Sequence, residues 1–338
     1  MGNSPTGVTF ASFGPLGLDV GRGIARLASD TGYRSFWTAE TVGQEAFATL
    51  AAIGADNPGL ELGTGVLAIQ LRTPMLAAMG AATLQSIVGE RDVLLGVGIS
   101  SPVVVRRWHG SDYGSSPLRQ MREYLELTKQ CLSGEAVSHD GEHYSTNRFR
   151  LGVRLAEKRP KVVLGALNEK MLQLAGELCD GVLLNYLPAT AVPWCIEQVR
   201  AGERRSGRRE GSCTVYAYVH VGVCDPHPAM EPARKDLFSY AVVPAYAKAF
   251  ERAGYGEEVA AVARAHSNRD REGALAGISD RMVSEIDICG DAAHVRSAVQ
   301  AYRDAGVEHP ILMPLPWGPD RTAVLEATLD AARPDRHP

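Results

Sequence analysis

One stretch, residues 160–188, restricts the possible folds of this chain more than any other. It contains two short runs of aliphatic side chains, at 162–164 and 182–184, with no polar residue inside either run. Between the runs lies a pattern of apolar residues at helical spacing, at Met171, Leu174, Ala175 and Leu178. Strands that are apolar on both faces belong in a parallel sheet, and two such strands joined by a helix form a right-handed βαβ unit. The sequence therefore predicts a parallel α/β fold.

The turn inside this unit, residues 165–170, is a candidate anion site. Asn168 is the predicted N-cap of the helix. A helix N-terminus presents free backbone N–H groups and a favourable dipole, so it favours an anion, usually a phosphate. The same residues fit an ordinary βα turn that holds no ligand, and both interpretations stay open on this pattern alone.

The rest of the chain repeats the alternation of strand and helix. Eight apolar stretches are predicted strands: 7–11, 33–38, 60–66, 93–98, 162–164, 182–184, 214–223 and 311–313. Helical patterns separate nearly all of them, and the predicted N-caps include Thr73, Asp291 and Asp320. Eight alternating units predict a (β/α)8 TIM barrel.

The length of 338 residues exceeds the roughly 250 residues that such a barrel needs, so insertions are required. We place them after strands 4 and 7, at 118–159 and 225–285, within one domain spanning residues 1–338. A doubly wound sheet is the alternative, suggested by Gly96 and Gly98 after the fourth strand. That G-x-G lacks its third glycine and the acidic residue that a dinucleotide site requires.

Composition excludes several classes of function. A net charge of -4 argues against a nucleic-acid partner. No apolar run approaches the roughly 20 residues of a membrane span, and the N-terminus lacks a signal-peptide pattern. Six cysteines are scattered without paired spacing, which is typical of reduced thiols in a cytoplasmic protein. We expect a cytoplasmic protein that acts on a small molecule.

In a barrel the active site is built from loops that follow the strands. The candidate positions are Ser12, Phe13, Glu40, Thr41, Thr64, Gly65, Val66, Gly98 to Ser101, Gly165 to Lys170, and Asn185. This set is mostly backbone and small side chains, and it contains no HExxH or paired-cysteine motif. We therefore predict no metal ligands. A large cofactor that brings its own chemistry suits such a lining better than acid–base hydrolysis does.

Several residues have a structural interpretation beside the functional one. Glycines 63 and 65 either let a cofactor ring approach the backbone, so that a side chain at Gly65 would take the place of the ring, or narrow a barrel strand. His139 and His143 flank Gly141, which favours a solvated turn over a metal site. Glu45 is explained equally well as a charge that complements a helix dipole. His109 is interpreted as a core histidine bonded to backbone.

Four segments together carry a resemblance to a known family: GTGVLAIQLRTPMLAAMGAATL, LLGVGISSPVVVRRWHG, DGEHY and LGALNEKMLQLAGELCDGVLLNYLP. The chain resembles the bacterial luciferase-like superfamily over nearly its whole length. Within it, the chain is most similar to the branch that uses the deazaflavin coenzyme F-420, near the methylenetetrahydromethanopterin reductases.

The resemblance implies a barrel, usually dimeric, with a flavin or deazaflavin at its C-terminal face. It implies a bulge behind the ring at Thr64, Gly65 and Val66, often with a non-proline cis peptide. It implies that Glu40 and Thr41 stand near the reacting edge of the ring, and we add Glu45 to these catalytic candidates. The other implied cofactor contacts are Phe13, Gly98, Ser100 and Ser101, and the phosphate contacts Gly165, Ala166, Asn168, Glu169 and Lys170.

Two departures from the family pattern bear on function. Flavin monooxygenases of this type usually carry histidines after the acid of the second strand, whereas Glu40 is followed by Thr41 and Val42. The phosphate turn contains Glu169 where the branch usually has proline, and a carboxylate there costs about 1 kcal/mol, which Lys170 offsets. The favoured function is hydride transfer between coenzyme F-420 and a small organic substrate.

Three alternatives remain. One is an FMN-dependent luciferase-like monooxygenase, and another is a cofactor-binding protein without turnover. The third, a phosphate-binding barrel aldolase or isomerase, lacks a strand-end lysine for Schiff-base chemistry.

Overall fold

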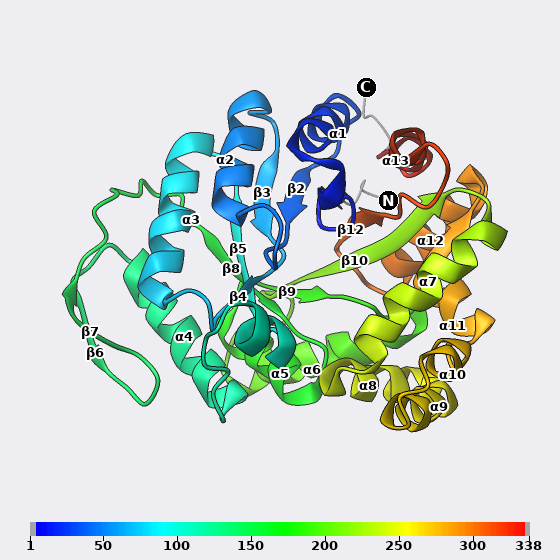
Figure 1. Cartoon of the computed structure of the whole chain (residues 1–338). Coiled ribbons are helices and arrows are strands. Elements are labelled where there is room, and N and C mark those ends of the chain that lie inside the picture. Colours follow the sequence, from blue (N-terminus) through cyan, green and yellow to red (C-terminus); the bar gives the residue numbers. More distant parts are fainter. Residues whose placement is uncertain (1–4, 335–338) are drawn as a thin grey trace.

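The computed structural model describes residues 5–334, and its centre is a closed parallel barrel (Figure 1). The barrel strands are β1 (Gly7–Thr9), β2 (Ser35–Thr38), β3 (Glu61–Thr64), β5 (Val93–Gly98), β8 (Lys161–Gly165), β9 (Gly181–Leu184), β10 (Thr214–Val223) and β12 (His309–Pro314). Neighbouring strands pair in this order, and the β12–β1 and β9–β10 pairs complete the ring. The predicted (β/α)8 barrel is confirmed, and each predicted strand is present.

Helices surround the barrel on its outside (Figure 1). They are α1 (Leu18–Asp30), α2 (Ala46–Asp56), α3 (Pro74–Val88), α4 (Pro117–Leu132), α5 (Glu169–Leu178), α6 (Val192–Arg205), α12 (Ala292–Asp304) and α13 (Arg321–Ala331). Three of the predicted caps form: Thr73, Asp291 and Asp320 accept backbone N–H bonds of 3.2, 2.8 and 3.0 Å. Gly306 ends α12 at a φ of 101°, which favours glycine.

The first predicted insertion was too long, because α4 packs between α3 and α5 as a barrel helix. The inserted part begins after it, with the antiparallel pair β6 (Val137–Asp140) and β7 (Ser145–Phe149), which projects from one side (Figure 1). His139 Nε2 donates to Glu123 Oε1 at 3.1 Å there, in a hairpin as expected. A two-residue strand, β4 (Leu67–Ala68), pairs with β5.

The second insertion builds a helical layer on the opposite side (Figure 1). It comprises α7 (Pro226–Ala241), α8 (Pro244–Phe250), α9 (Gly256–Ser267), α10 (Arg271–Ala276) and α11 (Asp280–Ile286). These helices share a hydrophobic core with Tyr186, the residue two positions after β9. The chain returns to the barrel through β11 (Asp287–Gly290), a strand that the sequence did not predict. β11 pairs in parallel with the C-terminal half of β10.

The interior of the barrel is filled by large side chains that include Trp37, Tyr216, Tyr218 and Met313. Gly63 faces them: a Cβ at this position would lie 2.3 Å from the Trp37 ring. The glycine is needed because the indole occupies that space, so the structural interpretation of Gly63 is correct. No helix within residues 5–334 combines the length and apolar character that crossing a membrane requires.

Candidate functional site

The ends of β3, β5 and β8 meet around the side chain of Val66 at the C-terminal face. A Cβ at Gly98 would lie 2.6 Å from one Val66 methyl, and a Cβ at Gly165 would lie 3.1 Å from the other. Both glycines are therefore required by close packing against Val66. The peptide bond between Gly65 and Val66 is cis, as the family resemblance implied. Three predicted cofactor segments thus lie side by side.

Gly65 itself faces the barrel interior, so our expectation that a side chain there would take the place of the ring is wrong. An added Cβ would lie 1.9 Å from the Tyr218 hydroxyl and 3.1 Å from a Leu183 methyl. The Tyr218 hydroxyl also donates a 2.9 Å hydrogen bond to the Gly65 carbonyl. Thr64 is likewise engaged with backbone, because its hydroxyl donates to the Gly96 carbonyl and accepts the Gly96 N–H, both at 2.8 Å.

The other predicted cofactor contacts differ in how exposed their side chains are to a ligand. Phe13 is fully buried and packs edge-on against Phe10, with ring centroids 5.0 Å apart, so only its backbone is left to face a ligand. Ala166 is also buried. Ser100 and Ser101 are half-buried, and the Ser101 hydroxyl accepts the Val104 N–H at 3.2 Å.

The two predicted catalytic acids share one arginine. Arg72 Nη2 lies 3.1 Å from both carboxylate oxygens of Glu40 and also pairs with Glu45. Glu45 is the N-cap of α2 and accepts the Ala48 N–H at 2.6 Å, which confirms its helix-terminal role. Sequence reasoning missed Arg72, although it lies inside a segment that carries the family resemblance.

Thr41 is tied to the loop after β5. His109 Nε2 donates to the Thr41 carbonyl at 2.6 Å, so the imidazole joins the loop after β2 to the turn at 103–108. His109 is exposed, so the expected core location is wrong, whereas the expected backbone partner is correct.

The predicted phosphate turn is held by the second insertion. Asn168 occupies the N-cap position of α5, but its side chain makes no cap; it donates to the Ala245 carbonyl at 2.9 Å. Arg252 donates to Asn168 Oδ1 at 3.2 Å and to the Leu167 carbonyl at 2.5 Å, and it stacks 3.9 Å from the Trp194 ring. The first N–H groups of α5 therefore have no side-chain acceptor within the described residues.

The charged residues of this turn lie on its surface. Glu169 and Lys170 are both exposed, and Gln173 Nε2 donates to Glu169 Oε1 at 3.5 Å. The Glu169 carboxylate is thus turned along the helix. Arg252 supplies a cation that the sequence did not indicate, because its position depends on the fold of the insertion.

Gln70 offers an unsatisfied polar group at the same face. Its amide nitrogen and oxygen are both buried and have no hydrogen-bond partner among residues 5–334. The neighbouring Ile69 N–H donates to the Gly98 carbonyl at 3.1 Å, which places this segment beside the end of β5. A buried planar amide without partners suits the C=O and N–H groups of a heterocyclic ring.

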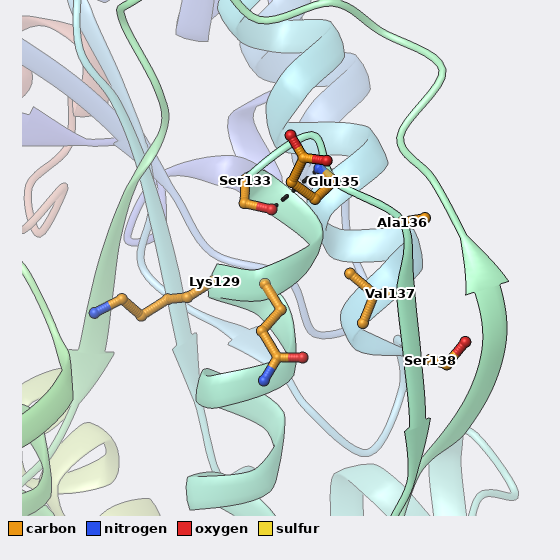
Figure 2. A pocket seen from close by; sticks show the side chains of 7 residues that line it. Lys129, Ser133, Glu135, Ala136, Val137 and Ser138 are labelled. Carbon is orange, nitrogen blue, oxygen red and sulfur yellow. Dashed lines mark hydrogen bonds between the residues drawn. The ribbon is translucent and has the colours of Figure 1, made fainter.

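Two surface hollows lie elsewhere. One of ≈ 480 Å³ separates the last turn of α4 from β6, around Lys129, Glu135 and Ser138 (Figure 2). Another of ≈ 460 Å³ is at the N-terminal end of the barrel, around Arg34, Glu61 and His309. Neither hollow is lined by a predicted site residue.

Known proteins of similar sequence identify the family of this chain. The luciferase-like monooxygenase family profile matches residues 11–309. A Mycobacterium tuberculosis protein, provisionally named a coenzyme F-420-dependent oxidoreductase, is 32% identical over 308 residues, 84% of this chain and 87% of the relative. The 5,10-methylenetetrahydromethanopterin reductase of Archaeoglobus fulgidus is 28% identical over 88% of this chain and 89% of its own.

A solved structure agrees at the level of the fold. The coenzyme F-420-dependent tetrahydromethanopterin reductase of Methanopyrus kandleri superposes with a TM-score of 0.79 at 22% identity, covering 98% of both chains. The barrel, the extent of the profile match and the mycobacterial relative lead to one conclusion. This chain belongs to the luciferase-like family.

Proposed function

We propose that this protein is an oxidoreductase that transfers a hydride between the deazaflavin coenzyme F-420 and a small organic substrate. The observation that carries the proposal is the similarity, over 84% and 88% of this chain, to relatives named for F-420 or for methylenetetrahydromethanopterin reduction. The absence of histidines after Glu40 supports hydride transfer over oxygenation.

The residues of the C-terminal face fit such a coenzyme. The ring would lie against the Val66 end of β3, with the orphaned Gln70 amide available to its polar edge. Gly98, Ser100, Ser101 and the Phe13 backbone would line the coenzyme side chain. The phosphate would bind the free N–H groups of α5, from Asn168 to Lys170, beside Gly165 and Ala166. Lys170 and Arg252 supply positive charge.

The coenzyme supplies the hydride chemistry, and the chain supplies position and charge. Glu40 and Thr41 would stand at the reacting edge, with Glu45 behind them. Arg72 fixes the Glu40 carboxylate from one side, and His109 fixes the Thr41 backbone from the other. Both loops are therefore held in place before a substrate arrives, which lowers the entropic cost of aligning it.

Turnover under two conditions tests this function. Reduced F-420 should be oxidised without oxygen when the protein is given a panel of ketones, enones and imines. The alternative, an FMN-dependent monooxygenase, is supported by the name of the family. It requires oxygen consumption with reduced FMN and no anaerobic oxidation of F-420. Binding of F-420 without turnover on the whole panel would favour a cofactor-binding protein.

We also propose a homodimer that forms through α2 and α3. α3 contains no Asp, Glu, Lys or Arg, and its exposed residues include Leu76, Met79 and Ile87. α2 contributes small exposed residues and a single charge, Asp56. An uncharged surface with exposed apolar side chains is typical of a subunit interface. Light scattering should give twice the chain mass for the wild type and the chain mass for Met79→Glu combined with Ile87→Glu.

We propose further that residues 1–338 form one domain and that the protein acts in the cytoplasm. Tyr186 packs into the core of the inserted helices, which supports a single unit. All six cysteines are free, which supports a reducing compartment.

A further inference from the structure

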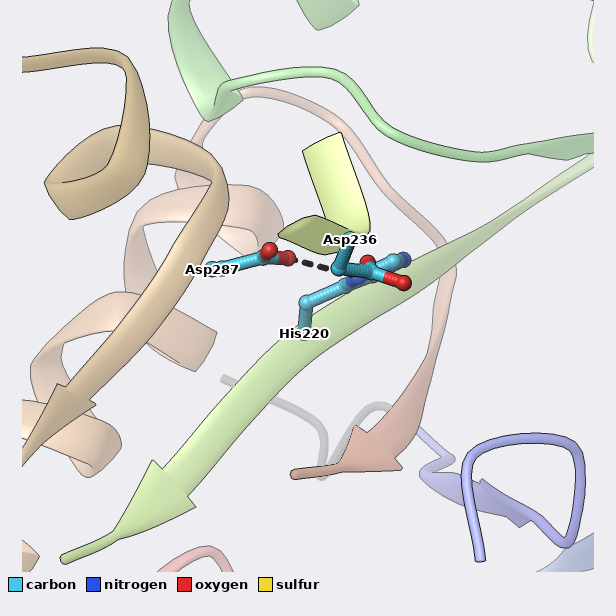
Figure 3. Close-up of side chains that lie close together, drawn as sticks. All are labelled: His220, Asp236 and Asp287. Carbon is cyan, nitrogen blue, oxygen red and sulfur yellow. Dashed lines mark hydrogen bonds and ion pairs between the residues drawn. The ribbon is translucent and has the colours of Figure 1, made fainter. Parts of the chain in front are cut away.

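Three chemically active side chains converge where the second insertion meets the barrel (Figure 3). His220 lies in the C-terminal half of β10, and Asp287 is its register partner on β11. Asp236 is on α7. One potential ligand atom from each residue lies within 4.8 Å of the others. His220 and Asp287 are each 1% exposed.

Hydrogen bonds orient the imidazole of His220. Asn185 Oδ1 accepts the backbone N–H of Tyr186 at 3.0 Å, which identifies that atom as the amide oxygen. His220 Nε2 lies 2.8 Å from the same oxygen and must donate to it. A neutral imidazole then presents the bare Nδ1 to Asp287 Oδ1, 3.0 Å away. A histidine that binds a metal usually donates its other N–H to such an oxygen.

The two carboxylates lack a cation. Asp287 Oδ2 is buried and has no hydrogen-bond partner among the described residues. Asp236 Oδ2 accepts the Tyr186 hydroxyl at 2.8 Å. Within residues 5–334, neither aspartate forms an ion pair with a lysine or an arginine. Burial raises the pKa of Asp236 to about 6 and holds the pKa of Asp287 well above its ordinary value. Buried carboxylates of this kind bind a proton or a metal ion.

We propose that His220 Nδ1, Asp236 and Asp287 bind one divalent transition-metal ion of the zinc class. One imidazole and two carboxylates form a ligand set that Zn²⁺ accepts, with a water as the fourth ligand. Asn185 and Tyr186 are the outer partners that orient the imidazole and one carboxylate. The ion joins β10, β11 and α7, so it fastens the inserted helices to the barrel. Arg252, which holds the phosphate turn, belongs to that same insertion.

Metal content of the full-length protein, purified without chelator, tests the site. Elemental analysis should find one equivalent, and chelated protein should bind one Zn²⁺ in calorimetry with a rise in Tm. Asp287→Asn should weaken this binding on the order of 100-fold, because loss of a ligand exceeds loss of an outer partner. His139→Gln, which removes a different histidine–carboxylate pair, should bind as the wild type does. If Asp287→Asn fails to fold, Asp236→Asn replaces it.

Cobalt substitution identifies the ligands. Co²⁺ in the wild type should give d–d bands without a thiolate charge-transfer band. Such a band would place the ion on a cysteine thiolate and overturn the assignment. The proposal is also overturned if the wild type binds no Zn²⁺, in which case the carboxylates hold a proton, or if Asp287→Asn binds Zn²⁺ unchanged.

Discussion

The two ends of the barrel each contain a buried histidine, and their neighbours differ. At the N-terminal end, His309 is 4% exposed and its Nε2 lies 2.9 Å from the Ser35 hydroxyl, which also accepts the Trp37 indole N–H at 2.8 Å. At the C-terminal end, His220 is 1% exposed and faces two aspartates. Burial lowers the pKa of both, to about 3 for His309 and about 4 for His220.

The two histidines are similarly buried, but their charged neighbours differ. Arg34 and Arg303 lower the pKa of His309 further, so its surroundings accept only the neutral ring. Asp236 raises the pKa of His220 against the effect of burial. At the N-terminal end the Ser35 hydroxyl links His309 to Trp37. Among residues 5–334, the C-terminal end retains an unpaired Asp287 carboxylate oxygen, an unpaired Gln70 amide and helix N–H groups without a side-chain cap. We therefore favour the C-terminal end as the location of the proposed site.

The largest expected effect is a loss of folding stability, and it tests whether Gly65 faces the packed interior of the barrel. Gly65→Val should destabilise the fold by about 3 kcal/mol or more, because the side chain would overlap Tyr218 and Leu183. Gly43→Ala is the matched control, since a Cβ there meets nothing within 4 Å. Urea unfolding measures both. A Gly65 variant as stable as the wild type would show that the interior is more open than described.

The second prediction concerns the N-terminal histidine and pH. The unfolded chain protonates His309 near its ordinary pKa of about 6.5, whereas the folded chain does so only near pH 3. Its contribution to the free energy of unfolding is therefore full above about pH 6.5 and is lost as pH falls toward 3. Compared with His309→Gln, the wild type should lose up to about 1.4 kcal/mol more per pH unit in this window. If the free energy of unfolding changed with pH equally in the wild type and in His309→Gln, the folded protein would not hold His309 in its neutral form.

The third prediction concerns the cation at the phosphate turn. Arg252→Ala should weaken F-420 binding about tenfold, because a charge-assisted contact to the turn is lost. Arg281→Ala is the control, since Arg281 also belongs to the insertion and lies over an aromatic ring, that of Tyr255. Calorimetry measures both affinities. Equal losses in the two variants would show that the effect is not local to the turn.

The smallest effects concern the exposed charges of the same turn. Lys170→Ala should weaken F-420 binding by a few-fold, an effect of about 0.3–1 kcal/mol. Glu169→Gln should tighten binding by less than this, because the Glu169 carboxylate is turned along the helix toward Gln173 and not toward the phosphate. Salt should reduce both changes. Unchanged affinities would move the phosphate toward Ser100 and Ser101 and leave residues 160–188 as scaffold.

The barrel was predictable because its signals are local. Apolar runs and caps such as Thr73 and Asp320 depend on neighbours within a few residues. Asn168 shows the limit, because its side chain bonds to Ala245 and Arg252 of the insertion instead of capping its own helix. Arg72, which pairs two predicted acids, and the cluster around His220 depend on contacts between distant segments. No periodicity or short motif records such contacts.

The central claim, that the C-terminal face binds a deazaflavin, is tested most directly by calorimetric titration of the purified protein with F-420 and, separately, with FMN. We predict saturable binding of both or of F-420 alone, with the tighter affinity for F-420, because the chain lacks the histidines after Glu40. Equal or tighter binding of FMN would contradict the account.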